Sequence, residues 1–328
     1  MFAEPSRPGQ MRKRQFRALR RYLVDEIHPY MEVHRRALDA AGVDHGRIAG
    51  LDEFARVSPT TLDEVGSGAG HLLEPTQDLI RSQGPVGLRL RCHAARLTGG
   101  RAKLDHERLA PRYKPLLWTR DGILRTGWSA ADLRRLGDLG RRLLQRAGVV
   151  GADRLLTVGL APDQTAFWQL SLGARAGGVT AMHLTSPDPA VLVDGNASVI
   201  AGPVAAIDAM FAAVEGHAVT TAIVVGEPPS AAERARLCSR WSAEVVSAWA
   251  PPGVRSLWSE RRGVPGLVTS ADADVVEIVD GEVVWSSLGW AGTVLLRLRT
   301  GVHATGHATS SGTGGVTVTL RDPAVVTS

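Results

Sequence analysis

Helices and short apolar strands alternate along the middle of the chain, and this pattern limits the possible folds more than any other feature. Between residues 129 and 147, leucines recur at helical spacing opposite a face of arginines. The expected strands are residues 154–160, 179–184, 197–201, 221–225 and 244–248, and the expected helices are residues 129–147, 164–176, 204–214 and 230–242. Because alternating strands and helices form βαβ units, this part predicts a largely parallel sheet covered by helices.

The C-terminal third changes to a β-rich pattern. Residues 273–279, 282–287 and 293–298 are expected strands, and Asp280-Gly281 is typical of a hairpin turn. The last residues, 307–328, are rich in Ser, Thr and Gly and are expected to be a flexible tail. We therefore expect an N-terminal helical and irregular segment packed on the core (1–110), an α/β core (111–250), a β-rich subdomain (251–306) and the tail (307–328).

The charge of the chain is uneven. The 328 residues have a net charge of +5, and a dense basic cluster lies near the N-terminus, formed by Arg12, Lys13, Arg14, Arg17, Arg20 and Arg21. A basic cluster can bind nucleic acid or anionic lipid. No interleaved aromatic residues or nucleic-acid motif accompany it, so we interpret it as the solvated face of a helix and expect no nucleic-acid partner.

The two cysteines, Cys92 and Cys238, are far apart and form neither a metal-binding spacing nor a disulfide framework. No apolar run follows the N-terminal basic residues, which argues against a signal peptide. The most apolar stretch, residues 190–214, is interrupted by Asp194 and Asp208, so no membrane span is expected. We expect a cytoplasmic protein. The ten histidines form no metal pattern, and no metal ligand is predicted.

Several short motifs occur in order between residues 30 and 302. They include Ala40-Ala41-Gly42-Val43-Asp44, Gly226-Glu227-Pro228, Gly281-Glu282-Val283-Val284 and, near the C-terminus, Arg297-Leu298-Arg299-Thr300-Gly301-Val302. Together they resemble the adenylate-forming (AMP-binding) enzymes, in particular the phenylacetate–CoA ligase and coenzyme F390 synthetase branch. The resemblance implies an α/β fold: the large N-terminal domain of an adenylate-forming ligase, with mixed α/β sheets, helices and a C-terminal β-rich subdomain.

The same resemblance implies the positions of a ligand site. ATP or AMP and CoA are the small molecules expected. The nucleotide-binding positions that carry over are Gly226, Glu227, Pro228, Trp249, Ala250, Arg299, Thr300 and Gly301. Phe167 and Trp168 lie where the family begins to line its acyl pocket, although aromatic residues in a helix core give the same pattern.

Four departures from the family pattern predict lost chemistry. The Ser/Thr/Gly-rich phosphate loop is replaced by residues 117–124, in which Gly122 is the only glycine. Gly253 stands where the family has a glutamate that helps to hold Mg²⁺, and Val302 stands where it has the aspartate that binds the ribose of ATP. The chain is also too short for the family's mobile C-terminal lid, which we therefore expect to be absent.

Three hypotheses follow. The chain is a degenerate relative, a pseudo-ligase that binds a nucleotide, an acyl group or a protein partner and acts as a scaffold or regulator. Alternatively, it is an active ATP-dependent ligase that converts an aryl or fatty carboxylic acid into an acyl adenylate and then a CoA thioester. A third possibility is a subunit of a split ligase whose other subunit supplies the lid. Because four elements depart from the pattern, the sequence favours the first.

Overall fold

The structure, a computed structural model, describes residues 8–48, 50–73, Leu90, 114–211, 219–310 and 316–320. The chain divides into two compact units, which are described one at a time. The first unit comprises residues 1–132, 271–302 and 310–314, and the second comprises residues 133–270, 303–309 and 315–328.

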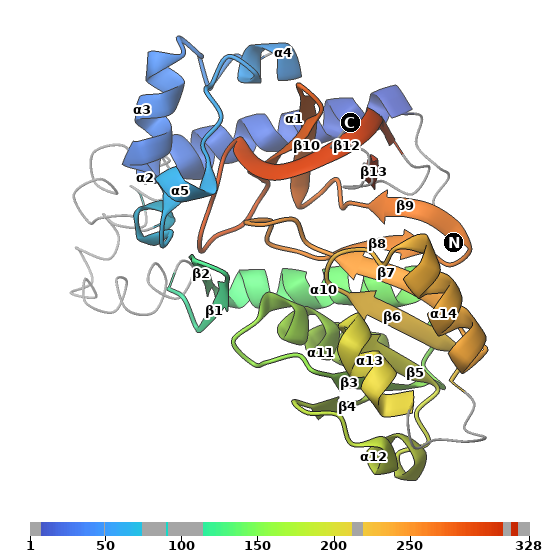
Figure 1. The fold of residues 1–328 in the computed structure, drawn as a ribbon. Helices are drawn as coiled ribbons and strands as arrows, with labels where there is room; N and C mark the ends of the chain where they lie inside the picture. The colour runs from blue at the N-terminus through green and yellow to red at the C-terminus, as the bar shows by residue number, and fades with distance from the viewer. Residues whose placement is uncertain are drawn as a thin grey trace, which may run out of the picture. The chain divides into compact units, whose positions relative to one another are not determined.

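A parallel sheet forms the centre of the second unit (Figure 1). Its strands lie in the order β7-β6-β5-β3-β4, and their bounds are β3 (Arg154–Val158), β4 (Thr180–Leu184), β5 (Val199–Gly202), β6 (Thr221–Val225) and β7 (Glu244–Trp249). Beyond β7 the order continues through antiparallel β8 (Trp258–Arg261), β9 (Val264–Val268) and β13 (Val316–Leu320). The alternating sequence pattern therefore produces the covered parallel sheet that it predicts.

Helices cover both faces of this parallel sheet (Figure 1). Consecutive strand residues point to opposite faces, so Leu155 packs in one core cluster and Leu156 in another, and both are fully buried. The first cluster contains residues of α10 (Ala130–Arg146) and α11 (Thr165–Gly177), and the second contains residues of α12 (Pro189–Asp194), α13 (Val204–Phe211) and α14 (Ala231–Trp241). Burial on both faces explains why these strands are almost wholly apolar.

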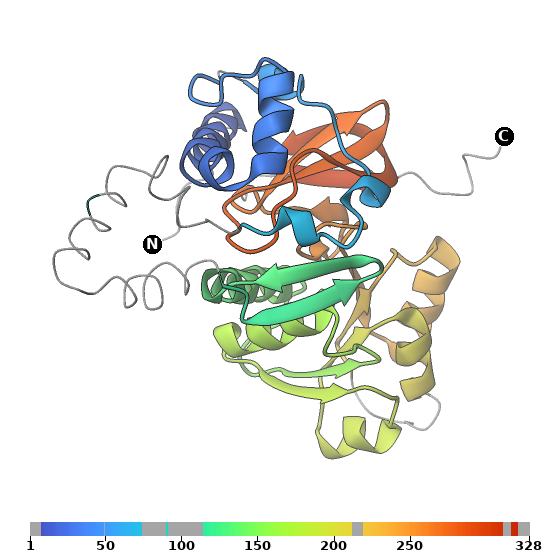
Figure 2. The same cartoon turned by 90° about the vertical axis from the view of Figure 1, so that its left-hand side faces the viewer.

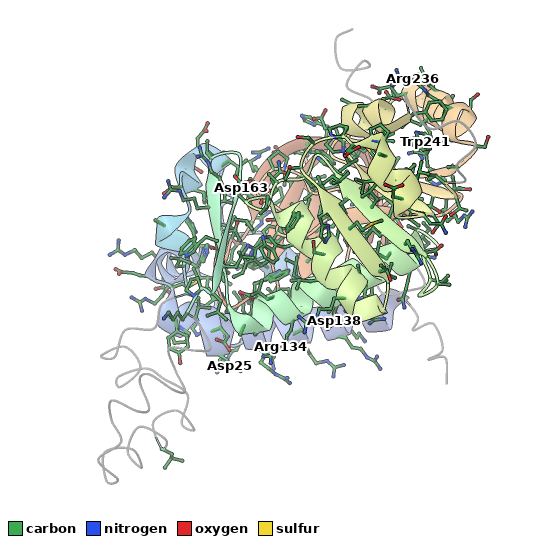
Figure 3. The ribbon with its side chains drawn as sticks, turned by 90° about the horizontal axis from the view of Figure 1, so that it is seen from below. Asp25, Arg134, Asp138, Asp163, Arg236 and Trp241 are labelled. Carbon is green, nitrogen blue, oxygen red and sulfur yellow. The ribbon has the colours of Figure 1, made fainter. Side chains whose placement is uncertain are left out.

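Side-chain caps fix the start of two of these helices. Before α10, Ser129 and Asp132 exchange backbone-to-side-chain hydrogen bonds of 3.0 and 3.2 Å. Before α14, Ser230 and Glu233 form the same reciprocal pair. The opposite side of α10 is polar: Arg134 and Asp138, one turn apart, are exposed (Figure 3). The capping residues therefore define where these helices begin, and the apolar side of α10 defines which side is buried.

Helices α10 and α11 approach each other at a pair of glycines. A Cβ built on Gly140 would lie 1.9 Å from the carbonyl oxygen of Gln169, and one built on Gly173 would lie 2.5 Å from the carbonyl carbon of Gly140. The two backbones are therefore in direct contact. Gly137, one turn earlier in α10, is different, because its Cβ would lie at an ordinary 3.4 Å from Leu172.

We predict that Gly140→Ala lowers the free energy of unfolding, because the added methyl group forces the two helices apart. The expected loss is about 1–3 kcal/mol, as for other overpacked cores. The matched control is Gly137→Ala, for which we expect no loss and a gain of up to about 1 kcal/mol from helix propensity. Urea unfolding followed by circular dichroism measures both, and equal stabilities of the two variants would contradict the close contact.

The first unit consists of short helices packed on a β-rich part. The helical segments are α1 (Pro8–Tyr22), a π-helical turn (Leu23–Ile27), α2 (His28–Tyr30), α3 (Glu32–Ala40), α4 (Leu51–Phe54), α5 (Leu62–Val65) and a 3-10 turn (Ala69–His71). The strands are β1 (Leu117–Asp121) and β2 (Leu124–Trp128), which form a hairpin, β10 (Asp274–Val279) and β11 (Glu282–Ser287), which form another, and β12 (Leu298–Ser310), which begins in this unit. Leu19, Leu23, Phe54 and Val294 are fully buried in its single core.

Two buried histidines lie at the base of this core. The Nε2 atom of His34 lies 3.0 Å from the carbonyl oxygen of Val294, and the rings of His34 and His71 are 5.2 Å apart. Burial lowers the pKa of His34 from 6.5 to about 4, against the opposing effect of the Val294 carbonyl. Burial likewise lowers the pKa of His71. Both rings are therefore neutral in the folded protein at neutral pH.

We predict that the protein loses stability as the pH falls from about 6.5 toward 4. The folded-state pKa of His34 is below its unfolded value, so in this window the unfolded chain binds more protons and is favoured. The expected loss from His34 alone is about 3 kcal/mol, since each pKa unit corresponds to about 1.4 kcal/mol. In urea unfolding at a series of pH values, His34→Gln, which retains an amide donor for Val294 but cannot titrate there, should show a shallower dependence. An unchanged slope in that variant would count against this role of His34.

Two sequence-based predictions are corrected. Residues 293–297 are not a strand. Arg297 has a positive φ of 47°, which a strand does not allow. The amides of Leu295 and Arg297 donate to the side chains of Ser287 and Ser286, respectively, in place of a strand ladder. Residues expected in the flexible tail form strands instead: β12 extends to Ser310, and in β13 Thr317 and Val318 pair with β9. Val316, Val318 and Leu320 alternate with polar residues as in a strand, but the Ser-, Thr- and Gly-rich composition favoured the prediction of a tail.

The other predicted elements agree closely with the structure. β6 and β11 have the predicted bounds, and the Asp280-Gly281 turn has φ values of 53° and 79°, as a tight hairpin requires. The division at residues 110, 250 and 306 stays a prediction. Among the residues that the structure describes, no helix is long and apolar enough to cross a membrane. Cys92 lies outside the described residues, and Cys238 is a free, half-buried thiol.

Candidate functional site

Part of the predicted nucleotide site lies at the carboxyl ends of β6 and β7. Val225 pairs with Ala248, so Gly226, the first residue after β6, lies beside Trp249, the last residue of β7. The Gly226 amide donates a 3.1 Å hydrogen bond to the Ala248 carbonyl, and its φ of 124° is one that favours glycine. Glu227 is exposed, whereas Pro228, Trp249 and Ala250 are half-buried. Ligands in open α/β sheets bind outside this edge, so the location suits a ligand.

The predicted acyl-pocket residues lie at the same edge, near the ends of β3 and β4. Phe167 and Trp168, in the first turn of α11, pack edge to face with ring centroids 5.4 Å apart. The ring of His183 from β4 lies 5.0 Å from Phe167, and its Nδ1 atom is 2.7 Å from the hydroxyl oxygen of Thr157. Burial lowers the pKa of His183. Phe167 and Trp168 are half-buried and His183 is exposed, so the three rings form a neutral aromatic cluster at the surface.

One strand separates the two groups of residues. In the sheet order, β5 lies between β6 and β3, so the strands β6 and β3 are about 10 Å apart, or two strand spacings. The structure thus places the predicted nucleotide residues of the second unit and the predicted acyl residues along a single edge. His183 was missed, because a lone histidine near the end of a strand gives no sequence signal.

Gly253, at the position of the family's metal-binding glutamate, occupies a constrained turn. The amide of Val254 donates to the carbonyl of Pro251, and Gly253 has a φ of 81°. Proline followed by glycine with positive φ is the pattern of a type II turn. The buried Gln169 side chain holds the segment that follows, because its amide group bonds both the N–H and the carbonyl of Leu257. A glutamate at residue 253 would therefore strain the backbone.

The Arg-Thr-Gly motif lies in the first unit, where its polar groups bond within the unit. The Arg299 Nε atom and the Gly301 amide donate to the two oxygens of Glu282, at 2.7 and 2.8 Å. The Thr300 hydroxyl donates to the carbonyl of Val283 at 2.8 Å, and accepts a weaker bond from the Val302 amide. The motif therefore ties β12 to β11. Glu282 was part of a recognised motif, but nothing in the sequence showed that it would pair with Arg299.

Arg297, two residues before this motif, is buried and anchors a distant loop. Its guanidinium donates to the carbonyls of Ala55 and Val57 and lies 3.1 Å from Glu277. Burial raises the pKa of Glu277, and the charge of Arg297 acts in the opposite direction. On the same segment, the backbone of Thr60 bonds to Arg297 and Arg299. These contacts are structural and leave the Arg297 side chain no role toward a ligand.

The segment expected at the phosphate loop is a tight hairpin (Figure 2). β1 and β2 pair continuously from Leu117 with Trp128 to Asp121 with Leu124, which leaves only Gly122 and Ile123 in the turn. In this two-stranded ladder every second amide bonds across the strands. Asp121 adds a negative charge beside the turn, and the Nε atom of Arg120 donates to the Gly122 carbonyl at 3.1 Å. A loop that encloses phosphates needs several free amides and small residues. Residues 117–128 do not meet this requirement.

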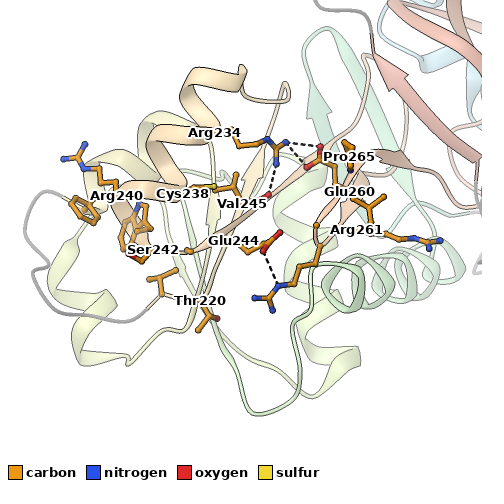
Figure 4. A pocket seen from close by; sticks show the side chains of 17 residues that line it. Thr220, Arg234, Cys238, Arg240, Ser242, Glu244, Val245, Glu260, Arg261 and Pro265 are labelled. Carbon is orange, nitrogen blue, oxygen red and sulfur yellow. Dashed lines mark hydrogen bonds and ion pairs between the residues drawn. The ribbon is translucent and has the colours of Figure 1, made fainter.

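Glu260 is the carboxylate nearest to Gly253 in the sequence, so its surroundings decide whether it fits the role of a metal ligand. It is buried in β8, and both of its oxygens accept hydrogen bonds from Arg234, at 2.8 and 2.9 Å. The Ser247 amide donates to it at 2.8 Å. Figure 4 shows the Arg234 side chain directed at Glu260 from α14. Its oxygens are therefore occupied within the protein, and they do not fit the role of a magnesium ligand.

The Arg234–Glu260 pair borders a large open pocket of about 1280 Å³ (Figure 4). The pocket is lined by the first residues of β7, by α14 and by the β8–β9 turn. It therefore lies toward the amino ends of the parallel strands, and neither Gly226 nor Trp249 lines it. We place the candidate ligand site at the carboxyl edge, because the residues that match the family motifs and the known preference of α/β sheets coincide there.

No metal centre is found within the described part of the chain: no three His, Cys, Asp or Glu side chains come together as possible ligands. With glycine at residue 253 and Glu260 engaged, the described residues do not fit the Mg²⁺ that the family implies. The hairpin at residues 117–128 likewise does not fit a triphosphate. An adenine or acyl group remains compatible with the aromatic residues Trp249, Phe167 and Trp168.

Comparisons with known proteins identify the fold. No family model matches the sequence, and no match is found among curated proteins. Among solved structures, an open conformation of 2-hydroxyisobutyryl-CoA ligase in complex with 2-HIB-AMP and CoA matches with a TM-score of 0.75 and 14% identity, over 97% of this chain and 70% of that one. The same ligase in its thioesterification state matches with a TM-score of 0.72, over 97% and 68% of the two chains.

The chain therefore has the fold of an adenylate-forming ligase, and the fold predicted from the sequence motifs is confirmed. The identity of 14% supports the fold alone. The predicted placement within the phenylacetate–CoA ligase branch stays a prediction, as do the roles of the individual site residues.

We predict that Arg234→Met destabilises the protein by about 2–3 kcal/mol. The variant leaves the carboxylate of Glu260 buried without its cation, although the 32% exposure of the Arg234 side chain moderates the cost. The control is Arg236→Met on the same helix, which removes a more exposed pair with Asp208 and should cost less than about 1 kcal/mol. Thermal and urea unfolding provide the measurement. In the double variant Arg234→Met/Glu260→Met, part of the loss should be recovered; if the double variant is less stable than the single one, the pair is not the cause.

Proposed function

We propose that this protein is a pseudo-ligase: it has the fold of an adenylate-forming CoA ligase, binds a nucleotide or an acyl group, and acts as a scaffold or regulator without activating a carboxylic acid. In the active reaction, a carboxylate attacks ATP and releases pyrophosphate, so catalysis depends on groups that hold and neutralise the phosphates. The proposal is that these groups are missing here, whereas the surfaces for the adenine and acyl groups remain.

The hairpin of β1 and β2 carries the proposal. Its two-residue turn stands where a phosphate loop is expected, and the pairing of the two strands leaves no run of consecutive free amides for phosphate oxygens. Asp121, beside the turn, would repel a triphosphate, and the Arg120 guanidinium donates to the carbonyl of Gly122 within the hairpin. Because the difference lies in the backbone, a change of rotamer or protonation state does not create a phosphate site.

Two further positions support the same proposal. Gly253 supplies no carboxylate for a metal, and its positive φ disfavours a glutamate there. Val302 supplies no acceptor for ribose hydroxyls, and burying an unpaired hydroxyl costs about 1–3 kcal/mol. The neighbouring Arg299 and Thr300 bond Glu282 and Val283, which gives the Arg-Thr-Gly motif a structural role that does not require ATP.

The retained ligand surface is the carboxyl edge of the parallel sheet. Trp249 and Ala250 beside Gly226 would accept the adenine of AMP, and Phe167 with Trp168 would accept an apolar acyl chain. 2-HIB-AMP, an acyl adenylate present in the matched ligase structure, combines both groups. We therefore expect this protein to bind AMP or an acyl adenylate analogue better than ATP, because the γ- and β-phosphates have no amides or cation to meet them.

We predict no ATP–pyrophosphate exchange with any member of a panel of aryl, fatty and hydroxy acids, with 2-hydroxyisobutyryl-CoA ligase as the positive control. The reason is the absence of a phosphate loop and of a metal-binding carboxylate. Val302→Asp and Gly253→Glu, alone or together, should leave exchange undetectable, because neither variant opens the hairpin. Exchange above background by the wild type with any acid would refute the pseudo-ligase proposal.

Isothermal titration with AMP, ATP and CoA tests the binding half of the proposal. AMP should bind more tightly than ATP, and Trp249→Ala should weaken AMP binding at least tenfold. Trp118→Ala, which removes an exposed tryptophan of β1, is the control and should leave the affinity unchanged. If none of the three ligands binds, the nucleotide site is absent, and only the role as a protein scaffold survives.

A further inference from the structure

The basic cluster near the N-terminus is not explained by the proposed function. Helix α1 contains no acidic residue, and the side chains of Lys13, Arg14, Arg17, Arg20 and Arg21 are all exposed. Within the described part of the chain, none of these five cations has a hydrogen bond or an ion pair. Five unpaired cations in three turns of helix repel each other, and an anionic partner would relieve this repulsion.

Three of the five cations surround a groove in the first unit. The groove has a volume of about 430 Å³ and is lined by Lys13, Arg17 and Arg20 together with residues around Leu51. Its floor is apolar: Leu19, Ile48 and Val275 are buried core residues, and Phe16 and Leu51 are half-buried. One acidic residue, Asp52, also lines it, so the charged lining has a net charge of +2 from three cations and one anion.

The chemistry of the groove selects its occupant. Along α1, Lys13 and Arg20 are seven residues apart, which corresponds to about 10 Å at 1.5 Å per residue. A small carboxylate would satisfy one of these cations and leave the others unpaired. A peptide segment with several acidic side chains can pair with all three, and an apolar side chain among them can reach the floor between Phe16 and Leu51.

A membrane or a nucleic acid fits the groove less well. The apolar face of α1, with Leu19 and Tyr22, is buried in the core and cannot insert into a bilayer. A bilayer surface and a DNA duplex would meet Arg14 and Arg21 as readily as Arg17 and Arg20, and neither places an apolar group on the floor. We propose that this groove docks an acidic segment of a partner protein, with an apolar residue as its anchor.

The test compares two double variants that remove the same charge from the same helix. Arg17→Gln/Arg20→Gln changes the groove, whereas Arg14→Gln/Arg21→Gln changes two equally exposed cations outside it. The probe is a fluorescein-labelled peptide in which one leucine is flanked on both sides by glutamates, and its partner probe has serine in place of the leucine. Fluorescence anisotropy measures the affinity of each protein for each peptide, and circular dichroism verifies that the variants are folded.

The leucine peptide should bind the wild type, and the groove variant should bind it at least tenfold more weakly. The control variant should stay within threefold of the wild type, and the serine peptide should bind at least fivefold more weakly than the leucine peptide. Equal losses in both variants, equal binding of both peptides, or no binding would overturn the proposal. Preferential binding of a DNA duplex or of phosphatidylserine vesicles would also overturn it, in favour of a non-specific polyanion surface. None of these outcomes affects the proposed pseudo-ligase function.

Discussion

The burial of the parallel sheet on both faces is the constraint on which the second unit depends. Because α10 and α11 cover one face and α12, α13 and α14 the other, a ligand can reach this sheet only at its edges. Contact of the covering helices requires glycines at residues 140 and 173. The chain enters loops at the carboxyl ends of β3, β6 and β7, and two of the predicted site residues, Gly226 and Trp249, lie at these ends. The location of the candidate site is thus a consequence of packing.

The Arg-Thr-Gly motif has structural contacts that do not depend on a ligand. Arg299, Thr300 and Gly301 bond Glu282 and Val283, and Arg297 binds the carbonyls of Ala55 and Val57. Removal of any of these groups would leave a buried or half-buried polar partner unsatisfied. Stability therefore retains the motif even where no nucleotide is bound. The side chain of Val302 is apolar and forms no such hydrogen bond.

The sequence predicted the regular elements well and the irregular connections poorly. The helical spacing of leucines predicts α10. The starts of α5 and α14 are each marked by a hydroxyl residue, Thr61 or Ser230, with a glutamate three residues later. These signals are local. The path of residues 293–297 instead depends on Ser286 and Ser287, whose side chains replace a strand partner, and on the positive φ of Arg297. Likewise, Glu282 meets Arg299 only through the pairing of distant strands. Contacts between residues that are far apart in the sequence therefore determine the arrangement of the site, and local sequence patterns do not reveal them.

The departures from the ligase pattern are of two kinds: a change of side chain at residue 302, and changes of the backbone in two turns. Val302 is a side-chain change that one substitution reverses. The two-residue turn of the β1–β2 hairpin and the Pro251–Val254 turn are backbone features, fixed by strand pairing and by the positive φ of Gly253. Restoring a phosphate loop would require inserted residues and the loss of ladder hydrogen bonds. The proposed loss of acid activation therefore rests mainly on these backbone features, because a single substitution at residue 302 does not alter them.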